Sequence, residues 1–135
     1  MSNATDQPAA RVYYDGACPV CSREIAQYRA ARGADAIDFV DVSACPPDAL
    51  GADLSREAAL ARMHVRLADG RLVSGAAAFA ALWVALPGFA WLARLAALPG
   101  AMAAMEAGYR LFLRLRRLWR RAPADGAYQG SAAPR

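Results

Sequence analysis

Apolar and polar positions alternate in short runs over the first half of this chain and give way to long apolar runs in the second half. Residues 11–14 and 37–42 have the composition of strands, and the segment between them, 19–32, carries apolar side chains at helical spacing until Gly33 supplies a stop. A strand, a helix and a second strand imply a right-handed crossover between parallel strands. The pattern therefore predicts an α/β domain that begins with a parallel pair.

A β-hairpin is expected after this crossover. Beyond a short helix predicted over 55–62, residues 64–67 and 71–74 alternate on either side of Asp69-Gly70, which is a strong hairpin signal. The hairpin and the parallel pair together predict a four-stranded mixed sheet.

Residues 76–105 are almost entirely apolar, and the run over 76–93, which no charged residue interrupts, is long enough to raise the question of a membrane span. Alanine supplies much of it and Pro87-Gly88 interrupts it, so two short buried helices over 76–86 and 89–97 explain the run better than one spanning helix. A last helix is expected over 101–121.

Charge is concentrated in this last helix. Residues 1–105 hold nine arginines and ten acidic residues, whereas residues 106–135 hold seven arginines and two acidic residues. The helix separates an apolar face from an arginine face, and only Leu113 and Arg116 depart from this division. The apolar face consists of Met105, Tyr109, Phe112, Leu115 and Trp119, and the opposite face consists of Arg110, Arg114, Arg117 and Arg121.

We expect the apolar face of the helix over 101–121 to pack on the domain and the arginine face to be solvated. Docking on anionic lipid or on an acidic partner is the alternative. No nucleic-acid partner is expected, because the chain holds no motif for one and a single arginine stripe is a weak electrostatic signal.

Length and composition fit a single domain. With 135 residues, 57% of them hydrophobic, the chain can bury a core without disulfides. We expect this domain over 11–121, a disordered N-terminus over 1–10 and a flexible tail over 122–135. Three cysteines, two of them in one motif, favour a reducing compartment, and no apolar signal segment is visible, so a cytoplasmic protein is expected.

The most informative segment is Asp15-Gly16-Ala17-Cys18-Pro19-Val20-Cys21, which places two cysteines where the first strand turns into the first helix. Unpaired N–H groups and the helix dipole lower the pKa of a thiol at a helix N-terminus. We therefore expect Cys18 to be the exposed nucleophile and Cys21, one turn further along, to be the better shielded resolving thiol. Half of a zinc site and a pair of unreactive thiols are the alternatives for this spacing, and the strand-to-helix context favours redox chemistry.

Three further residues have chemistry to consider. Asp15 could accept a proton from the cysteine pair or raise its pKa by like-charge repulsion, and it could equally close the turn by Asx hydrogen bonding. Cys45 could be a regulatory thiol, although an idle loop cysteine is the simpler interpretation. His64 could join the cysteines in a metal site, but the separations lack the paired spacing of zinc sites, and no bound metal is expected.

In these residues the sequence resembles the DCC thiol-disulfide oxidoreductases, a family named for the residues that stand here as Asp15, Cys18 and Cys21. The resemblance spans about residues 11–121. It implies a thioredoxin-like fold, in which the four-stranded mixed sheet carries flanking helices and a helical C-terminal extension, and a dithiol-disulfide activity on substrates that are poorly defined for the family. Its later landmarks are Met63-His64-Val65, Asp69-Gly70-Arg71, Gly75, Ala78-Phe79, Leu86-Pro87-Gly88, Leu98-Pro99-Gly100 and Tyr109 with the arginine-rich stretch that follows.

One feature departs from the broader thioredoxin pattern. Thioredoxin-like enzymes usually carry a cis-proline just before the third strand, where it faces the dithiol and helps to align a peptide. Here Met63-His64 stands in that region with no proline nearby. We therefore do not carry over that mode of peptide docking, and we expect Met63 or His64 to face Cys18.

These observations predict a thiol-disulfide oxidoreductase in which Cys18 attacks, Cys21 resolves and the substrate is a protein or small-molecule thiol or disulfide. Electrons pass through the cysteine pair itself, so no cofactor is required. The alternative is a noncatalytic module that docks on a partner or membrane surface through its apolar helices and its arginine-rich helix. An exposed Cys18 of low pKa favours the enzyme, and a buried inert Cys18 favours the module.

Overall fold

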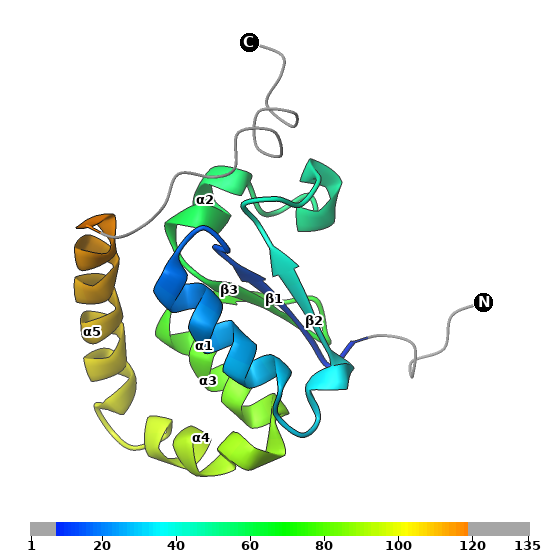
Figure 1. Cartoon of the computed structure of the whole chain (residues 1–135). Coiled ribbons are helices and arrows are strands. Elements are labelled where there is room, and N and C mark those ends of the chain that lie inside the picture. Colours follow the sequence, from blue (N-terminus) through cyan, green and yellow to red (C-terminus); the bar gives the residue numbers. More distant parts are fainter. Residues whose placement is uncertain (1–7, 119–135) are drawn as a thin grey trace.

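The computed structural model describes residues 8–118, which form a four-stranded sheet with helices packed against it (Figure 1). The strand order is β2-β1-β3-β4, with β1 (Ala10–Tyr14) parallel to β2 (Ile37–Asp41). The hairpin of β3 (His64–Leu67) and β4 (Leu72–Ser74) joins the sheet antiparallel to β1. The mixed sheet predicted from the sequence is confirmed, and with it the thioredoxin-like α/β fold.

The helices begin close to the predicted positions. Pro19 stands at the first helical position of α1, and the Ser55 hydroxyl caps α2 by accepting the N–H of Ala58 at 3.1 Å. The helix predicted over 19–32 ends earlier, at Arg29. The helices are α1 (Pro19–Arg29), α2 (Arg56–Ala61), α3 (Ala76–Ala85), α4 (Ala90–Ala96) and α5 (Ala101–Leu115), and a 3₁₀ turn, Arg116–Leu118, continues α5.

The central strand β1 contributes to two cores, because successive side chains of a strand point to opposite faces of the sheet. Val12 is buried with Ile25 of α1 and Leu82 of α3. Tyr13 is buried in a separate cluster with Ala59 of α2. α1 and α3 therefore cover one face of the sheet and α2 covers the other, which leaves the carboxyl end of β1 at the edge where all three layers meet.

The first strand begins one residue earlier than the pattern predicted. Ala10, which we expected to be disordered, pairs with Ile37 and Leu67 and is only 2% exposed. The small alanine side chain fits between the two neighbouring strands. Because alanine has a low preference for strands, the sequence pattern did not indicate that the strand begins there. Most of the N-terminus expected to be disordered, residues 1–7, and the tail expected over 122–135 lie outside the described residues.

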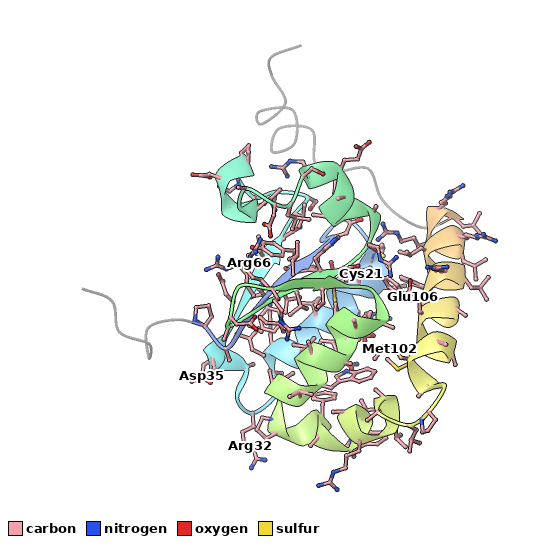
Figure 2. All side chains as sticks on the ribbon, turned by 180° about the vertical axis from the view of Figure 1, so that it is seen from behind. Cys21, Arg32, Asp35, Arg66, Met102 and Glu106 are labelled. Atoms are coloured by element: carbon pink, nitrogen blue, oxygen red, sulfur yellow. The ribbon has the colours of Figure 1, made fainter. Side chains whose placement is uncertain are left out.

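α5 packs on the rest of the domain through Glu106. Its carboxylate accepts the N–H of Ala76 at 3.1 Å and forms an ion pair with Arg62 at 2.5 Å, and Figure 2 shows Glu106 turned toward the domain. Gly75 leaves room for this pair, since a Cβ added there would lie 1.7 Å from the Arg62 Nη2. Glu106 therefore ties the C-terminal helix to the start of α3 and to Arg62 at the end of α2.

Aromatic side chains complete the packing of α5. The ring of Tyr109 meets Phe79 of α3 edge to face, with centroids 5.5 Å apart, and stacks on Phe112 at 6.1 Å. The expected packing of the apolar face is therefore confirmed for these residues. Leu115 departs from it, because it is 44% exposed, and Trp119 and Arg121 lie outside the described residues.

Within residues 8–118, no single helix is long and apolar enough to cross a membrane. The segments Pro87–Ala96 and Ala101–Leu118 reach that length and composition only as a pair, and they meet at a bend of 103°.

Candidate functional site

The dithiol segment starts in a tight turn that Asp15 closes. Its Oδ1 accepts the N–H of Ala17 at 3.0 Å, and its carbonyl accepts the N–H of Cys18 at 3.2 Å. This is the Asx hydrogen bonding that we considered for Asp15. The turn brings Cys18 to the N-cap of α1, shortly after β1 ends at Tyr14.

Gly16 explains why the motif needs a residue without a side chain at this turn. Its N–H donates to the Asp41 Oδ1 at 2.9 Å, and an added Cβ would lie 2.0 Å from the other oxygen of that carboxylate. Asp41 ends β2 and also accepts the N–H of Ser43 at 3.0 Å. The end of β2 therefore holds the turn before α1 in place.

Cys18 is the N-cap of α1. Its Sγ accepts the N–H of Cys21 at 3.4 Å, so the sulfur takes one of the unpaired N–H groups of the first turn. The expectation that Cys18 is exposed and Cys21 shielded is wrong for this structure: Cys18 is 0% exposed, whereas Cys21 is partly exposed. The physical reason is the capping bond, which folds the Cys18 side chain back over the helix start.

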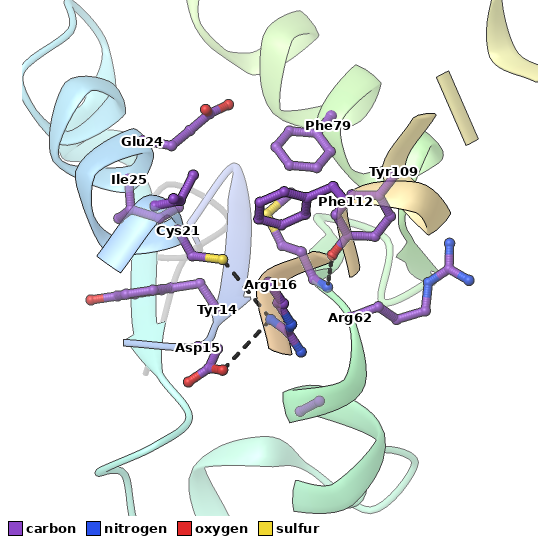
Figure 3. Close-up of a pocket in the computed structure, with 13 residues that line it drawn as sticks. Tyr14, Asp15, Cys21, Glu24, Ile25, Arg62, Phe79, Tyr109, Phe112 and Arg116 are labelled. Carbon is purple, nitrogen blue, oxygen red and sulfur yellow. Dashed lines mark hydrogen bonds and ion pairs between the residues drawn. The ribbon is translucent and has the colours of Figure 1, made fainter. Parts of the chain in front are cut away.

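The sulfur of Cys21 faces Arg116, as Figure 3 shows. The Arg116 Nη1 lies 3.9 Å from the Cys21 Sγ and 3.6 Å from the Asp15 Oδ2. Its Nη2 donates to the carbonyl oxygens of Leu60 and Ala61 at the end of α2. Arg116 is only 8% exposed and Asp15 only 4%, so the guanidinium and the carboxylate form a buried pair beside the dithiol.

Burial, and after it the adjacent Cys18 sulfur, raises the pKa of the Cys21 thiol to about 12. Arg116 acts in the opposite direction, because a nearby positive charge favours the thiolate. In the reduced protein Cys21 therefore keeps its proton at neutral pH.

Beside Cys21 lies a pocket of about 200 Å³ between α1, α3 and α5. Its walls are mostly apolar, and Figure 3 shows Phe79 of α3 and Phe112 of α5 among the residues that line it. The apolar side chains that line it are Val20, Ile25, Ala59, Met63, Phe79 and Phe112.

The backbone of Met63 borders the same pocket, and its polar groups are bonded within the chain. Its N–H donates to the Tyr109 hydroxyl at 2.6 Å, and its carbonyl accepts the N–H of Gly75 at 3.0 Å. No peptide bond among residues 8–118 is cis. Met63 lies near Cys21 in the pocket, whereas the His64 Nδ1 contacts the carbonyl of Arg62 at 2.9 Å.

A comparison with protein families identifies the family of this chain. Residues 12–122 match the model of the DCC1-like thiol-disulfide oxidoreductases. The chain belongs to this family. No curated protein and no solved structure matches the chain. The matched range contains the capped Cys18, the pocket-lining Cys21 and Arg116, so the family match covers the whole site of this DCC1-like protein.

The remaining candidates lie apart from the dithiol of this DCC1-like protein. Cys45 packs against the core that contains Tyr13, and burial raises the pKa of its thiol. Burial likewise lowers the pKa of His64. Within residues 8–118, no three His, Cys, Asp or Glu side chains are grouped so that they could hold a metal ion.

Arg116 is a site residue that was not predicted from the sequence. We noted it only as a departure from the division into an apolar and an arginine face. The signal was nevertheless present, because Arg116 follows Tyr109 and Phe112 at helical spacing and so falls on the face that packs inward. An arginine on an apolar face has to find a buried partner, and here that partner is Asp15.

Proposed function

We propose that this protein catalyses thiol-disulfide exchange through Cys18 and Cys21, with Cys18 as the nucleophile and Cys21 as the resolving thiol. The observation that carries the proposal is the Cys18 Sγ at the N-cap of α1, where it accepts the N–H of Cys21 at 3.4 Å. A thiolate at that position is stabilised by the N–H and by the helix dipole, while Cys21 retains its proton.

The exchange proceeds in two steps. The Cys18 thiolate attacks one sulfur of a substrate disulfide, forms a mixed disulfide and displaces the other substrate sulfur as a thiolate. Cys21 then loses its proton to water and attacks the Cys18 Sγ. An internal disulfide forms, the bond to the substrate breaks, and the second substrate thiolate leaves. Two electrons pass from the protein dithiol to the substrate, and the reverse sequence oxidises a substrate dithiol.

Access to Cys18 requires a rotation of its side chain. The sulfur is buried while it caps α1, and the hydrogen bond that it accepts from the Cys21 N–H is weak, because sulfur is a weak acceptor. We propose that the Cys18 side chain turns from the Cys21 N–H toward the pocket when a substrate binds. Asp15 keeps the turn closed through its bond to Ala17 and pairs with Arg116 throughout the cycle.

The pocket favours a substrate with an apolar group next to its reactive sulfur. Its walls include Phe79 and Phe112, and α5 borders it. Docking of an extended peptide on the backbone of Met63 is disfavoured, because the N–H and the carbonyl of that residue are bonded to Tyr109 and Gly75. The proposal therefore covers small-molecule thiols and disulfides, and protein thiols that can reach into the pocket from outside.

A noncatalytic docking module is the second candidate, and the burial of Cys18 is the observation that favours it. Exposed apolar side chains on α4, on α5 and between these two helices supply a surface for such docking. They include Leu95, Leu98 and Leu111, each at least half exposed at 50%, 55% and 57%. The module interpretation requires that the cysteines do not exchange.

An aromatic disulfide that releases a coloured thiol separates the two candidates. In a Cys45→Ser background, the reduced protein is expected to release two equivalents of thiol and to end with a Cys18–Cys21 disulfide. Cys21→Ser is expected to release one equivalent and to retain a mixed disulfide on Cys18, because attack remains and resolution is lost. Cys18→Ser is expected to react slowly.

Two outcomes contradict this proposal. A protein that releases no thiol, or one equivalent per cysteine without an internal disulfide, is not an exchange catalyst. A mixed disulfide trapped on Cys21 in Cys18→Ser, with an unreactive Cys21→Ser, reverses the roles of the two sulfurs.

A further inference from the structure

Arg116 reaches the dithiol from the opposite end of the chain. It begins the 3₁₀ turn that continues α5, and 95 positions separate it from Cys21. Its Nη1 lies 3.9 Å from the Cys21 Sγ. A buried guanidinium costs solvation energy that its partners must offset, and here the Asp15 carboxylate and the carbonyls of Leu60 and Ala61 do so. The side chain is thus held in one position, pointing at the sulfur.

We propose that Arg116 is a catalytic residue of the exchange reaction and stabilises the thiolate that forms on Cys21 when Cys21 displaces the substrate from Cys18. This inference rests on the proposed function. It assigns to the resolving step, the attack of Cys21 on the mixed disulfide, the group that stabilises the attacking thiolate.

The resolving step needs such a group. Cys21 lies in a partly buried site where its thiol holds its proton tightly, yet only the thiolate can attack a disulfide. In the mixed disulfide, the Cys21 S–H loses its proton to water and the electron pair on Cys21 forms the bond to the Cys18 Sγ. The bond between Cys18 and the substrate sulfur breaks, and the departing thiolate takes a proton from water. Arg116 offsets the negative charge on Cys21 between these two events.

The other charged and titratable groups near Cys21 do not remove the need for Arg116. Most are neutral or anionic and so do not favour a thiolate. Arg62 is the other cation at the pocket, and it is paired with Glu106 at 2.5 Å. The charged and titratable groups that border the pocket or the Cys21 sulfur are Tyr14 and Asp15 at the end of β1, Cys18 at the N-cap of α1, Glu24 on α1, Arg62 after α2, Tyr109 on α5, and Arg116 in the 3₁₀ turn after α5.

The two phases of thiol release measure attack and resolution separately. In the Cys45→Ser background, with the aromatic disulfide in excess, Arg116→Gln is expected to leave the first phase within about twofold of the parent. An opposite charge within 4–6 Å lowers the pKa of a thiol by roughly 1 to 3 units, so removing Arg116 raises the pKa of Cys21 by that amount. Each unit of increase lowers the net rate about threefold, because the smaller thiolate fraction is partly offset by a more nucleophilic thiolate. The second phase is therefore expected to slow roughly 3- to 30-fold.

The pH dependence of the second phase distinguishes an electrostatic role from a structural one. Resolution accelerates as pH rises and Cys21 ionises, so loss of the cation moves the whole profile of Arg116→Gln to higher pH. Arg116→Lys keeps the charge and is expected to recover part of the rate. Arg114→Gln is the matched control, since Arg114 is exposed on the last turn of α5, and its two phases are expected to equal those of the parent.

Asp15→Asn provides a second test, in which the pH profile of the second phase is expected to shift in the opposite direction. Asparagine preserves the acceptor for the Ala17 N–H, so the turn is retained, but it removes the carboxylate that shares Arg116 with Cys21. The second-phase profile is then expected to move to lower pH. This variant also covers the case in which Arg116→Gln does not fold.

Three results overturn the inference. They are a second phase in folded Arg116→Gln that keeps the parent rate and profile, an equal slowing of both phases, and an Asp15→Asn profile that stays in place or moves to higher pH. Failure of the proposed function is recognised separately, because the parent itself would then show no second phase and Cys21→Ser would trap nothing.

Discussion

The hydroxyl of Tyr109 lies 2.6 Å from the backbone nitrogen of Met63 and accepts its hydrogen bond. This bond joins α5 to the residue before β3. Both Tyr109 and Met63 also line the pocket beside Cys21. The C-terminal helix thus completes the site, and its contacts can be tested one at a time.

Replacing Tyr109 with Phe removes the acceptor and leaves the Met63 N–H without its partner. An unsatisfied buried donor costs about 1–3 kcal/mol, so the free energy of unfolding in urea is expected to fall by that amount. Tyr14→Phe is the control, because the hydrogen bond that the Tyr14 hydroxyl accepts comes from the exposed Arg29. A Tyr109→Phe protein as stable as the control would contradict the importance of this bond.

Glu106 makes stability depend on pH. The hydrogen bond from Arg62, followed by that from the Ala76 N–H, lowers the pKa of Glu106 to about 2. A carboxyl whose pKa is lower in the folded state stabilises the fold above its unfolded pKa of about 4.3, and this contribution is lost as the pH falls toward 2. Glu106→Gln is therefore expected to be less stable than the parent at pH 7.

The same substitution is expected to flatten the fall in unfolding free energy between about pH 5 and pH 2, which is the window set by the two pKa values. Chemical unfolding at several pH values measures this. Glu57→Gln, at an exposed glutamate in the first turn of α2, serves as the control and should retain the parent slope. Parallel curves for Glu106→Gln and the parent would show that the ion pair does not form in solution.

The raised pKa of Cys21 has separable causes. Burial is the largest and the Cys18 sulfur is the next. In a Cys18→Ser/Cys45→Ser protein, the thiolate absorbance near 240 nm reports Cys21 alone, and its pKa is expected to fall below the native value of about 12 while staying above that of an ordinary thiol. Adding Arg116→Gln should raise it again. A pKa that Cys18→Ser leaves unchanged would show that the two sulfurs are not coupled.

The C-terminal helix can be removed to weigh packing against membrane docking. A chain that stops after Ala104 loses Tyr109 and Phe112, and each large buried side chain contributes roughly 1.5–3 kcal/mol, so stability is expected to fall by several kcal/mol relative to a chain that stops after Leu118. If the helix is instead a surface anchor, both chains melt alike and the shorter one loses its binding to anionic vesicles, a binding that salt would weaken.

Much of the fold could be predicted from local patterns. The alternation around Asp69-Gly70 predicted the hairpin, and helical spacing with Pro19 predicted α1, because each of these signals acts between residues a few positions apart. The motif that contains Cys18 and Cys21 predicted a dithiol at a helix start for the same reason. Errors arose at ends, as at Ala10, where burial between neighbouring strands and not local preference decides the boundary.

The sequence by itself determined the order of strands and helices and the place of the dithiol at the start of α1. Only the tertiary structure decided that Cys18 is buried, that Cys21 faces the pocket, and that Arg116 contacts it. The physical reason is distance along the chain. Spacing within the helix places Arg116 on the inward face, but it carries no information about which groups lie across from that face, and those groups, Asp15 and Cys21, come from the other end of the chain.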